Sequence, residues 1–337
     1  DSATDIGTNS VRFQNAYVDT YYGDGSNLTG IAGTANVRTG ILDVAGISTF
    51  RNTVNIGAAV TISESGIEAS GIGITIANIN GNQIGGRRNL IINGAMKVAQ
   101  RGTSNTGLDG YGSVDRFYPD KNQLDNLQGT QEQVGVTDLP GFTNAFKLDI
   151  TTAETALAAD EYFTIGHRIE AQDLQQLAYG TSSAKSMTLS FHVKSSTTGT
   201  YVVSCYQADG GRLITGTYTI NSANTWERKT FTFATTGFTS GNFDTGTGVG
   251  LRLVFSLGNG PGRQASPDQW HSSVRMGPTG ETNLVATNGA TLDIAKVQLE
   301  VGTQATPFED IFYNLLLLFM NVTFYEKFKS KKISKFK

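Results

Sequence analysis

Apolar and polar residues alternate along much of the C-terminal two thirds of the chain. Six runs show this period of two, at 186–196, 200–210, 212–220, 225–236, 249–260 and 290–302. A period of two is typical of β-strands, because successive side chains point to opposite faces of a sheet. In two of the runs, the residues that share one apolar face are Leu189, Phe191 and Val193, and Leu251, Leu253 and Phe255. We therefore predict a two-sheet β-sandwich with one buried face per sheet, and a single short helix at 169–179.

The first 86 residues show shorter runs, in which single Ile, Leu, Val, Phe and Tyr residues are separated by Gly, Asn, Ser and Thr. Alternating Ile and Val residues here are Val54, Ile56, Val60, Ile62, Ile72, Ile74 and Ile76. A monomer with this sequence would bury little core, whereas identical chains could bury these residues against one another. We predict a glycine-rich, trimeric β stem, resembling a β-prism or β-helix. The alternative is a flexible linker, which the repeated Ile and Val residues disfavour.

The amino-acid composition also favours an all-β fold. The chain of 337 residues has 40 Gly against 6 Pro, and only 16% of its residues are charged, a balance typical of β-rich extracellular or virion surfaces. The net charge is −3 although residues 326–337 hold six lysines, so the main body is acidic and nucleic acid is not an expected partner. The single cysteine, Cys205, excludes an internal disulfide and a zinc site made of cysteines from one chain.

The domain boundary is expected at the glycine and arginine pairs of 85–88, which precede RNLIINGAMKVAQRG. We predict a β-rich oligomeric stem over 1–86, the sandwich over 87–310 and an atypical lysine-rich tail over 311–337. The apolar run 311–320 is shorter than the roughly 20 residues of a membrane-spanning helix, and so we expect no membrane insertion.

Two stretches carry a family resemblance. The segment DIGTNSVRFQNAYVDTYYGDGSNLTGI resembles the stem repeats of tailed-phage fibres, particularly those of marine cyanophages. The segments RNLIINGAMKVAQRG and TLDIAKVQLEVGTQATPFED are similar to the ends of a jelly-roll domain that recurs near the tips of phage tail fibres and is itself similar to carbohydrate-binding modules. The resemblance covers about residues 5–310.

The resemblance implies a homotrimeric stem followed by a jelly-roll β-sandwich, located in the tail fibre of the virion. Its implied partners are further copies of this chain, other phage tail proteins, and host surface polysaccharide or lipopolysaccharide. The tail 311–337 departs from the family, and two interpretations stay open: a terminus replaced by recombination or a frame change, or an amphipathic helix with a solvated lysine end.

No catalytic motif is present in the sequence. His167, His192 and His271 lie far apart, and there is no nucleophile elbow, zinc-protease motif or phosphate loop. The acidic pairs at 160–161 and 309–310 could hydrolyse a glycoside only if their carboxyl groups faced each other across a sugar, whereas adjacent strand residues point to opposite faces. We expect these pairs to flank turns. His192 is interpreted as an exposed strand histidine that faces away from the core. We expect no enzymatic activity.

Sugar recognition uses aromatic side chains together with planar hydrogen-bonding groups. Trp270 lies in a long loop rich in Gly, Pro and polar residues, the best candidate for glycan contact, although it could instead cap the edge of the sandwich. The neighbouring candidates in this loop are Arg263, Gln264, Asp268, Gln269 and His271. A second set, Tyr206, Asp209 and Arg212, lies in the turn YQADGGR, which could equally be a plain hairpin turn. Trp226 is predicted to be a core residue.

No cofactor is expected apart from a structural calcium ion. Jelly-roll carbohydrate-binding modules often hold such an ion between their first and last strands, which the resemblance places near Asn93 and Asp293.

The predicted function is noncatalytic, multivalent attachment of the virion to host surface glycan. One alternative is a purely structural connector or decoration protein of the fibre. Another is a polysaccharide depolymerase, which would need a long β-helix with carboxylates across a groove. A bacterial adhesin is a third option, which we do not expect because no export signal or anchor is visible in the sequence.

Overall fold

A computed structural model describes residue 10, three short segments (54–56, 60–63 and 66–69), and residues 88–310 apart from 235–237, 240–243 and 272–274. The chain divides into two compact units, Asp1–Ile74 and Thr75–Lys337. The predicted boundary near residue 86, the alternating residues at 72–76 and the tail 311–337 lie outside the described residues.

The described part of the first unit is a small antiparallel sheet. Its strands are β1 (Val54–Ile56), β2 (Val60–Ser63) and β3 (Gly66–Ala69), in that order. The strands predicted from the alternation at 54–56 and 60–62 are therefore confirmed. The trimeric β-prism or β-helix stays a prediction.

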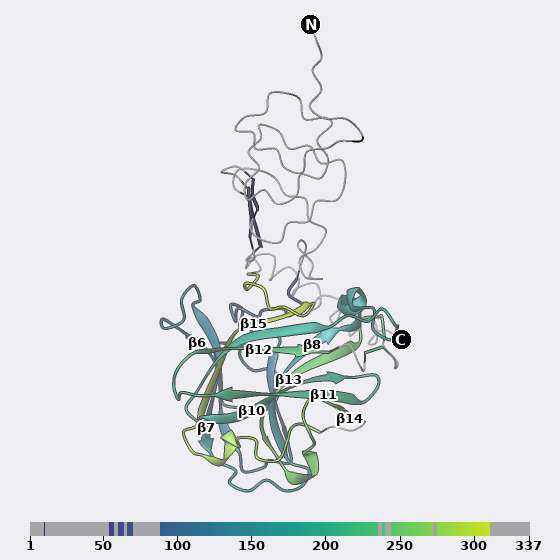
Figure 1. The fold of residues 1–337 in the computed structure, drawn as a ribbon. Helices are drawn as coiled ribbons and strands as arrows, with labels where there is room; N and C mark the ends of the chain where they lie inside the picture. Colours follow the sequence, from purple (N-terminus) through teal and green to yellow (C-terminus); the bar gives the residue numbers. More distant parts are fainter. Residues whose placement is uncertain are drawn as a thin grey trace, which may run out of the picture. The chain divides into compact units, whose positions relative to one another are not determined.

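The second unit contains two six-stranded sheets, in which every pair of neighbouring strands is antiparallel (Figure 1). The first sheet has the order β14-β11-β10-β13-β8-β5 and the second β12-β9-β15-β7-β6-β4. The strands of the first sheet are β5 (Phe117–Asn122), β8 (Tyr162–Glu170), β10 (Gly199–Gln207), β11 (Arg212–Ile220), β13 (Val249–Asn259) and β14 (Trp270–His271). The strands of the second are β4 (Ser104–Asn105), β6 (Gln128–Gly135), β7 (Asn144–Thr152), β9 (Met187–Ser195), β12 (Glu227–Phe233) and β15 (Thr291–Val301). This all-β architecture is consistent with the predicted jelly-roll sandwich.

All six strands predicted from alternation are present, as β9, β10, β11, β12, β13 and β15. The apolar faces expected for β9 and β13 are both buried in one core between the sheets. The connecting 3₁₀ helices are η1 (Ala171–Leu177), η2 (Pro261–Arg263) and η3 (Leu284–Ala286).

The predicted helix at 169–179 is wrong in type and extent. Ile169 and Glu170 pair with β13 as the end of β8, because Ile169 is needed in the core, and only η1 follows. No helix in the described part of the chain is long and apolar enough to cross a membrane.

The beginning and the end of the sandwich are joined through β15. The buried side chain of Asn89 donates to the carbonyl of Val297 (3.2 Å) and accepts from the backbone N–H groups of Ile91 (2.9 Å) and Leu299 (3.2 Å). The Glu309 carboxylate accepts two further N–H groups of the opening segment, those of residues 88 and 89, at 2.7 Å each. The two sequence segments that carry the jelly-roll resemblance therefore lie side by side.

We expect Asn89→Ala to lower the free energy of unfolding by about 3 kcal/mol, because it leaves buried backbone groups without their hydrogen bonds. Thermal denaturation followed by circular dichroism measures this loss. Asn126→Ala, at an exposed position, is the matched control and should change stability little. Equal stability of the two variants would contradict the structural role of Asn89.

Candidate functional site

The outer face of the first sheet carries the side chains that the core does not use. Along β8, Phe163, Ile165 and His167 are buried on the core side, whereas the residues between them alternate to the outside. The hydrogen-bond register continues the outward row from strand to strand: Tyr118 of β5 faces Gly166 of β8, which faces Val254 of β13. Residues far apart in sequence are thereby brought together on one surface.

A groove on this face is formed largely by tyrosines and apolar side chains, and we call it the tyrosine groove. Its volume is about 100 Å³. The lining residues are Tyr118, Asp120, Tyr162, Thr164, Gly166, Tyr206, Leu213, Arg252, Val254 and Met276. Leu213, Val254 and Met276 form a buried apolar cluster against which Tyr162 and Tyr206 pack. The groove thus has an apolar base between two partly exposed aromatic rings.

Two charged side chains line the same groove. The guanidinium of Arg252 lies 5.5 Å from the ring centre of Tyr206, its cross-strand neighbour on β10. The Nε of Arg252 is buried and has no hydrogen-bond partner among the described residues. Burial, and then the charge of Asp109, raises the pKa of the Asp120 carboxyl, while Arg252 and Arg168 oppose that rise. The groove therefore offers both a donor and an acceptor to a polar ligand.

Gly166 makes room for the ring of Tyr118. A Cβ atom at residue 166 would lie 2.5 Å from Cζ of Tyr118, closer than two carbon atoms can approach. The ring is also held by Arg168, whose Nε donates to the tyrosine hydroxyl (3.3 Å) and whose guanidinium lies 4.8 Å from the ring centre. Tyr111, exposed by 36%, extends this aromatic surface with its ring centre 4.9 Å from that of Tyr118.

A buried carboxyl group supports the neighbouring part of the face. Glu281 accepts hydrogen bonds from the hydroxyl of Ser256 (2.7 Å) on β13 and from the amide of Asn259 (2.8 Å). Burial raises its pKa to about 7, despite these two hydrogen bonds. Both carboxyl oxygens are engaged within the chain, so Glu281 holds its loop against the sheet.

The structure divides the nine glycan-contact residues predicted from the sequence. Tyr206 lines the tyrosine groove, and Arg263 lies beside it, with its guanidinium 5.7 Å from the ring centre of Tyr162. The Nε of Arg263 also donates to the carbonyl of Asp160 (3.3 Å). These two predicted residues are thus brought to one face.

Trp270 and Arg212 lie together at the edge of the first sheet. Trp270 pairs with Ile214, a core residue, so its ring points to the core side and contacts Phe238 edge-on, with 4.7 Å between ring centres. The guanidinium of Arg212 lies 4.7 Å from the ring centre of Trp270. The structure thus gives Trp270 the edge-capping position that the sequence left open as an alternative, and glycan contact by Trp270 stays a prediction.

The other predicted residues serve local structure. The ring nitrogen Nε2 of His271 lies 2.8 Å from the carbonyl of Ser266, and the Asp209 carboxylate accepts the N–H of Asp244 (3.0 Å). Gln264 accepts the hydroxyl of Thr279 (3.0 Å). The N–H of Asp268 donates to a carbonyl of β11 (2.8 Å), and Gln269 is exposed.

Two interpretations of second-sheet residues need correction. Trp226 is not in the main core but packs on a small separate cluster, and its Nε1 donates to Asp138 (2.9 Å). It precedes β12 in the outward register of Arg228, which explains this position. His192 faces away from the core as predicted, but it is half-buried rather than exposed.

The two positions considered for calcium have other partners. The amide of Asn93 donates to the carbonyls of Val98 and Asp115 (2.9 Å each), and its oxygen accepts the N–H of Val98 (3.1 Å). The Asp293 carboxylate lies 3.4 Å from the ammonium of Lys194. Within the described residues, no group of three or more His, Cys, Asp and Glu side chains could hold a metal ion. The calcium site stays a prediction.

Tyr206 is the residue of the tyrosine groove that was a candidate from the sequence, because most of the other candidates lie with Trp270 in its loop. The polar positions of each strand held the missing signal: Tyr118 and Asp120 alternate with Phe117 and Pro119 within β5. What the alternation does not give is the strand order, which places Tyr118 and Tyr206 in one groove.

No family model matches this chain, and no curated protein sequence matches it. Solved structures with a similar arrangement include the enzymatically active domain of tailspike protein 4 of bacteriophage CBA120 (TM-score 0.33, 13% identity, 63% of this chain and 21% of that chain). A family 11 carbohydrate-binding module from Clostridium thermocellum, in complex with a mixed-linked tetrasaccharide, has a TM-score of 0.31 and 13% identity over 61% of this chain and 99% of that one.

A third similar structure is the N-terminal cellulose-binding domain of a Cellulomonas fimi glucanase (TM-score 0.27, 14% identity, 62% of this chain and 100% of that chain). This chain spans only 21% of the tailspike chain. The identities to these structures are 13–14% and the TM-scores lie between 0.27 and 0.33.

The raised pKa of Glu281 predicts a dependence of stability on pH. The folded state binds the carboxyl proton more tightly than the unfolded chain, so this stabilisation is fully present below pH 4.5 and is lost as the pH rises through about 7. In the wild-type protein this titration changes the free energy of unfolding by about 3 kcal/mol between low and high pH. We expect Glu281→Gln to abolish that change.

Urea denaturation at several pH values measures the effect. Asp125→Asn, which removes an exposed carboxyl, is the control and should leave the pH dependence unchanged. A wild-type profile retained by Glu281→Gln would contradict the assignment.

Proposed function

We propose that the sandwich binds a saccharide in the tyrosine groove, and that the chain is a noncatalytic receptor-binding subunit of a phage tail fibre that attaches the virion to host surface glycan. The observation that carries the binding proposal is the convergence of Tyr118, Tyr162 and Tyr206 with Arg252 and Asp120 on one face. The fibre and its virion location rest on the sequence resemblance.

The chemistry of the groove suits a sugar ring. A pyranose has apolar C–H faces, which pack on aromatic rings, and a rim of hydroxyl groups, which need planar donors and acceptors. Tyr162 and Tyr206 supply rings beside the apolar base. The guanidinium of Arg252 and the carboxyl of Asp120, which both line the groove, supply a donor and an acceptor.

The small size of the groove favours weak binding by each copy. A volume of about 100 Å³ is below the range of pockets that enclose a whole ligand, so one sugar residue would be held only in part. Three copies on a shared stem would bind a repetitive surface with much higher avidity than one. The proposed homotrimer thus agrees with the proposed site.

Hydrolysis is the less favoured alternative. Glycoside hydrolysis ordinarily uses a pair of carboxyl groups across the scissile bond. Asp120 is the acidic side chain among the residues that line the groove, and nearby Glu281 uses both of its oxygens within the chain. A purely structural role in the fibre is the other alternative, and a binding assay distinguishes it.

We expect Tyr206→Ala to weaken glycan binding roughly tenfold, because it removes one aromatic wall of the groove. Tyr206→Phe keeps the ring and should retain most of the affinity. Gln269→Ala, in the loop favoured by the sequence, should have no effect. The measurement is binding of the full chain to an array of bacterial lipopolysaccharides and capsular polysaccharides, with circular dichroism to verify folding.

A folded full chain that binds no glycan on the array would leave the structural role. Binding that is lost in Gln269→Ala but kept in Tyr206→Ala would move the site to the loop. Release of reducing ends from a bound polysaccharide would instead support hydrolysis.

A second variant tests the geometry of the groove without altering a polar group. Gly166→Val should weaken binding several-fold, because its side chain would displace the ring of Tyr118 from its place across β8. Gly135→Val, at an exposed position where an added Cβ would meet only the carbonyl oxygen of Thr143 at 4.0 Å, controls for the general cost of replacing a glycine. Unchanged binding in a folded Gly166→Val protein would exclude the Tyr118 side of the groove.

The proposed homotrimer is tested by sedimentation equilibrium of the full chain. We expect a mass three times that of one chain, since the stem residues are proposed to be buried against identical chains. A monomer at all concentrations would contradict the trimeric stem.

A further inference from the structure

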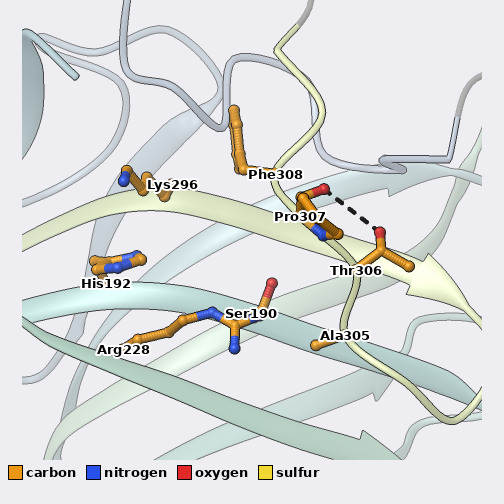
Figure 2. Close-up of a pocket in the computed structure, with 8 residues that line it drawn as sticks. All are labelled: Ser190, His192, Arg228, Lys296, Ala305, Thr306, Pro307 and Phe308. Carbon is orange, nitrogen blue, oxygen red and sulfur yellow. Dashed lines mark hydrogen bonds between the residues drawn. The ribbon is translucent and has the colours of Figure 1, made fainter. Parts of the chain in front are cut away.

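The outer face of the second sheet holds a pocket in which three basic side chains meet (Figure 2). We call it the basic pocket, and its volume is about 380 Å³. The lining residues are Ser190, His192, Arg228, Lys296, Ala305, Thr306, Pro307 and Phe308. It lies on the other sheet from the tyrosine groove and shares no residue with it.

Three adjacent strands position the basic groups. His192 of β9 is the direct cross-strand partner of Arg228 on β12 and of Ala295 on β15. The register between β15 and β9 then shifts between Ala295 and Gln298, and Lys296 in this bulge has a left-handed backbone with φ of 53°. A bulge re-aims a side chain, and a non-glycine residue in this conformation is strained. The bulge thus brings Lys296 to the wall of the pocket.

The segment 305–308 forms the opposite wall and is held firmly. The buried carboxylate of Glu300 accepts the N–H (2.8 Å) and the hydroxyl (2.7 Å) of Thr306. Phe308 packs edge-on against Phe142, with 5.0 Å between ring centres. The pocket therefore has a fixed apolar side, made of Ala305, Pro307 and Phe308, facing a basic side, as Figure 2 shows.

The basic side lacks a counter-ion within the described part of the chain. None of the eight lining residues is acidic, and the guanidinium of Arg228 forms no hydrogen bond or ion pair with a described residue. The Nδ1 atom of His192 is buried without a hydrogen-bond partner there. Lys296 donates to the carbonyl of Pro140 (3.1 Å), which does not neutralise its charge. Glu300 is engaged by Thr306.

Burial and the basic neighbours of His192 lower its pKa. Burial, then Lys296 and then Arg228 lower the pKa of His192 to about 4. Burial also lowers the pKa of Lys296. The next basic residue on β9, Lys194, is paired with Asp138 and Asp293, and the segment 305–308 carries no titratable side chain. His192 is thus neutral at pH 7 in a site of positive potential.

We propose that the basic pocket is a second binding site, which takes the carboxylate or phosphate group of an acidic saccharide residue. The planar guanidinium of Arg228 suits the two oxygens of such a group. Ser190 and His192 offer further hydrogen bonds, and Lys296 adds charge. The pocket is larger than a single oxyanion needs, and its apolar side gives a sugar ring a surface to contact.

The test is calorimetric titration of the full chain at low salt with glucuronate, glucose 6-phosphate, glucose and inorganic phosphate. We expect at least one of the two acidic sugars to bind with a dissociation constant of about 1 mM, and binding to weaken as salt is added. No binding of either acidic sugar would overturn the proposal. Inorganic phosphate binding as tightly as glucose 6-phosphate, with no binding of glucuronate, would overturn the assignment to a saccharide.

Variants localise the site. Arg228→Gln should weaken binding of the acidic sugar roughly tenfold, whereas Arg228→Lys should keep part of it. Lys185→Gln makes the same change of charge at an exposed position outside the pocket and should have no effect. Wild-type affinity in Arg228→Gln, or an equal loss in Lys185→Gln, would overturn the proposal.

Nuclear magnetic resonance of the histidine rings gives an independent readout. Saturation with the acidic sugar should raise the pKa of His192 from about 4 towards its ordinary value, because a bound anion offsets Lys296 and Arg228. His192→Gln identifies the signal. A pKa of His192 that does not move on saturation would place the bound sugar elsewhere and overturn the proposal.

Discussion

Alternation of side chains across two stacked sheets is the constraint on which both proposed sites depend. The single core between the sheets takes every second residue of the central strands, for example Phe163 and Ile165 of β8 or Leu189 and Phe191 of β9. The residues between them must then face outward, in rows fixed by the strand register. A rigid core thus presents two outer faces whose chemistry is free to differ, and in this chain one carries the tyrosine groove and the other the basic pocket.

Closure of the sandwich fixes these faces. Asn89 and Glu309 join the opening segment to β15 and to the segment that follows it, through hydrogen bonds that bridge more than 200 residues of chain. The same closing segment continues past Thr306 to form a wall of the basic pocket. The residues that close the sandwich and the residues that line the basic pocket therefore belong to one stretch of chain. A substitution that breaks the closing hydrogen bonds of Glu309 would also disturb the wall of the pocket.

Two faces on opposite sides of one sandwich suit a polymeric ligand better than a single enclosed pocket does. The tyrosine groove offers aromatic and hydrogen-bonding contacts for a neutral sugar ring, and the basic pocket offers an oxyanion site. Bacterial surface glycans present repeating units in many copies, so several weak contacts on several chains add up to tight attachment. Neither proposed site requires a reaction, which agrees with a role in adsorption.

The sequence by itself determined six of the strands of the sandwich, β9 to β13 and β15. The alternation at 186–196 and 249–260 predicted β9 and β13, and hydrophobicity alone fixed which of their faces is buried, because a one-residue slip would expose Leu189 or Leu253. The sequence pattern could not predict β6, because its sequence QGTQEQVG is almost entirely polar. This segment becomes a strand only by pairing with β7 and β4.

Only the tertiary structure decided the sites. Trp270, the strongest candidate in the sequence, turns to the core side because it pairs with Ile214, whereas Tyr118 and Tyr206 meet because β5 and β10 flank β8 and β13. Lys296 reaches the basic pocket through a bulge that no local pattern indicates. Side-chain direction is a local property of a strand, but proximity between strands depends on the order in which they pair.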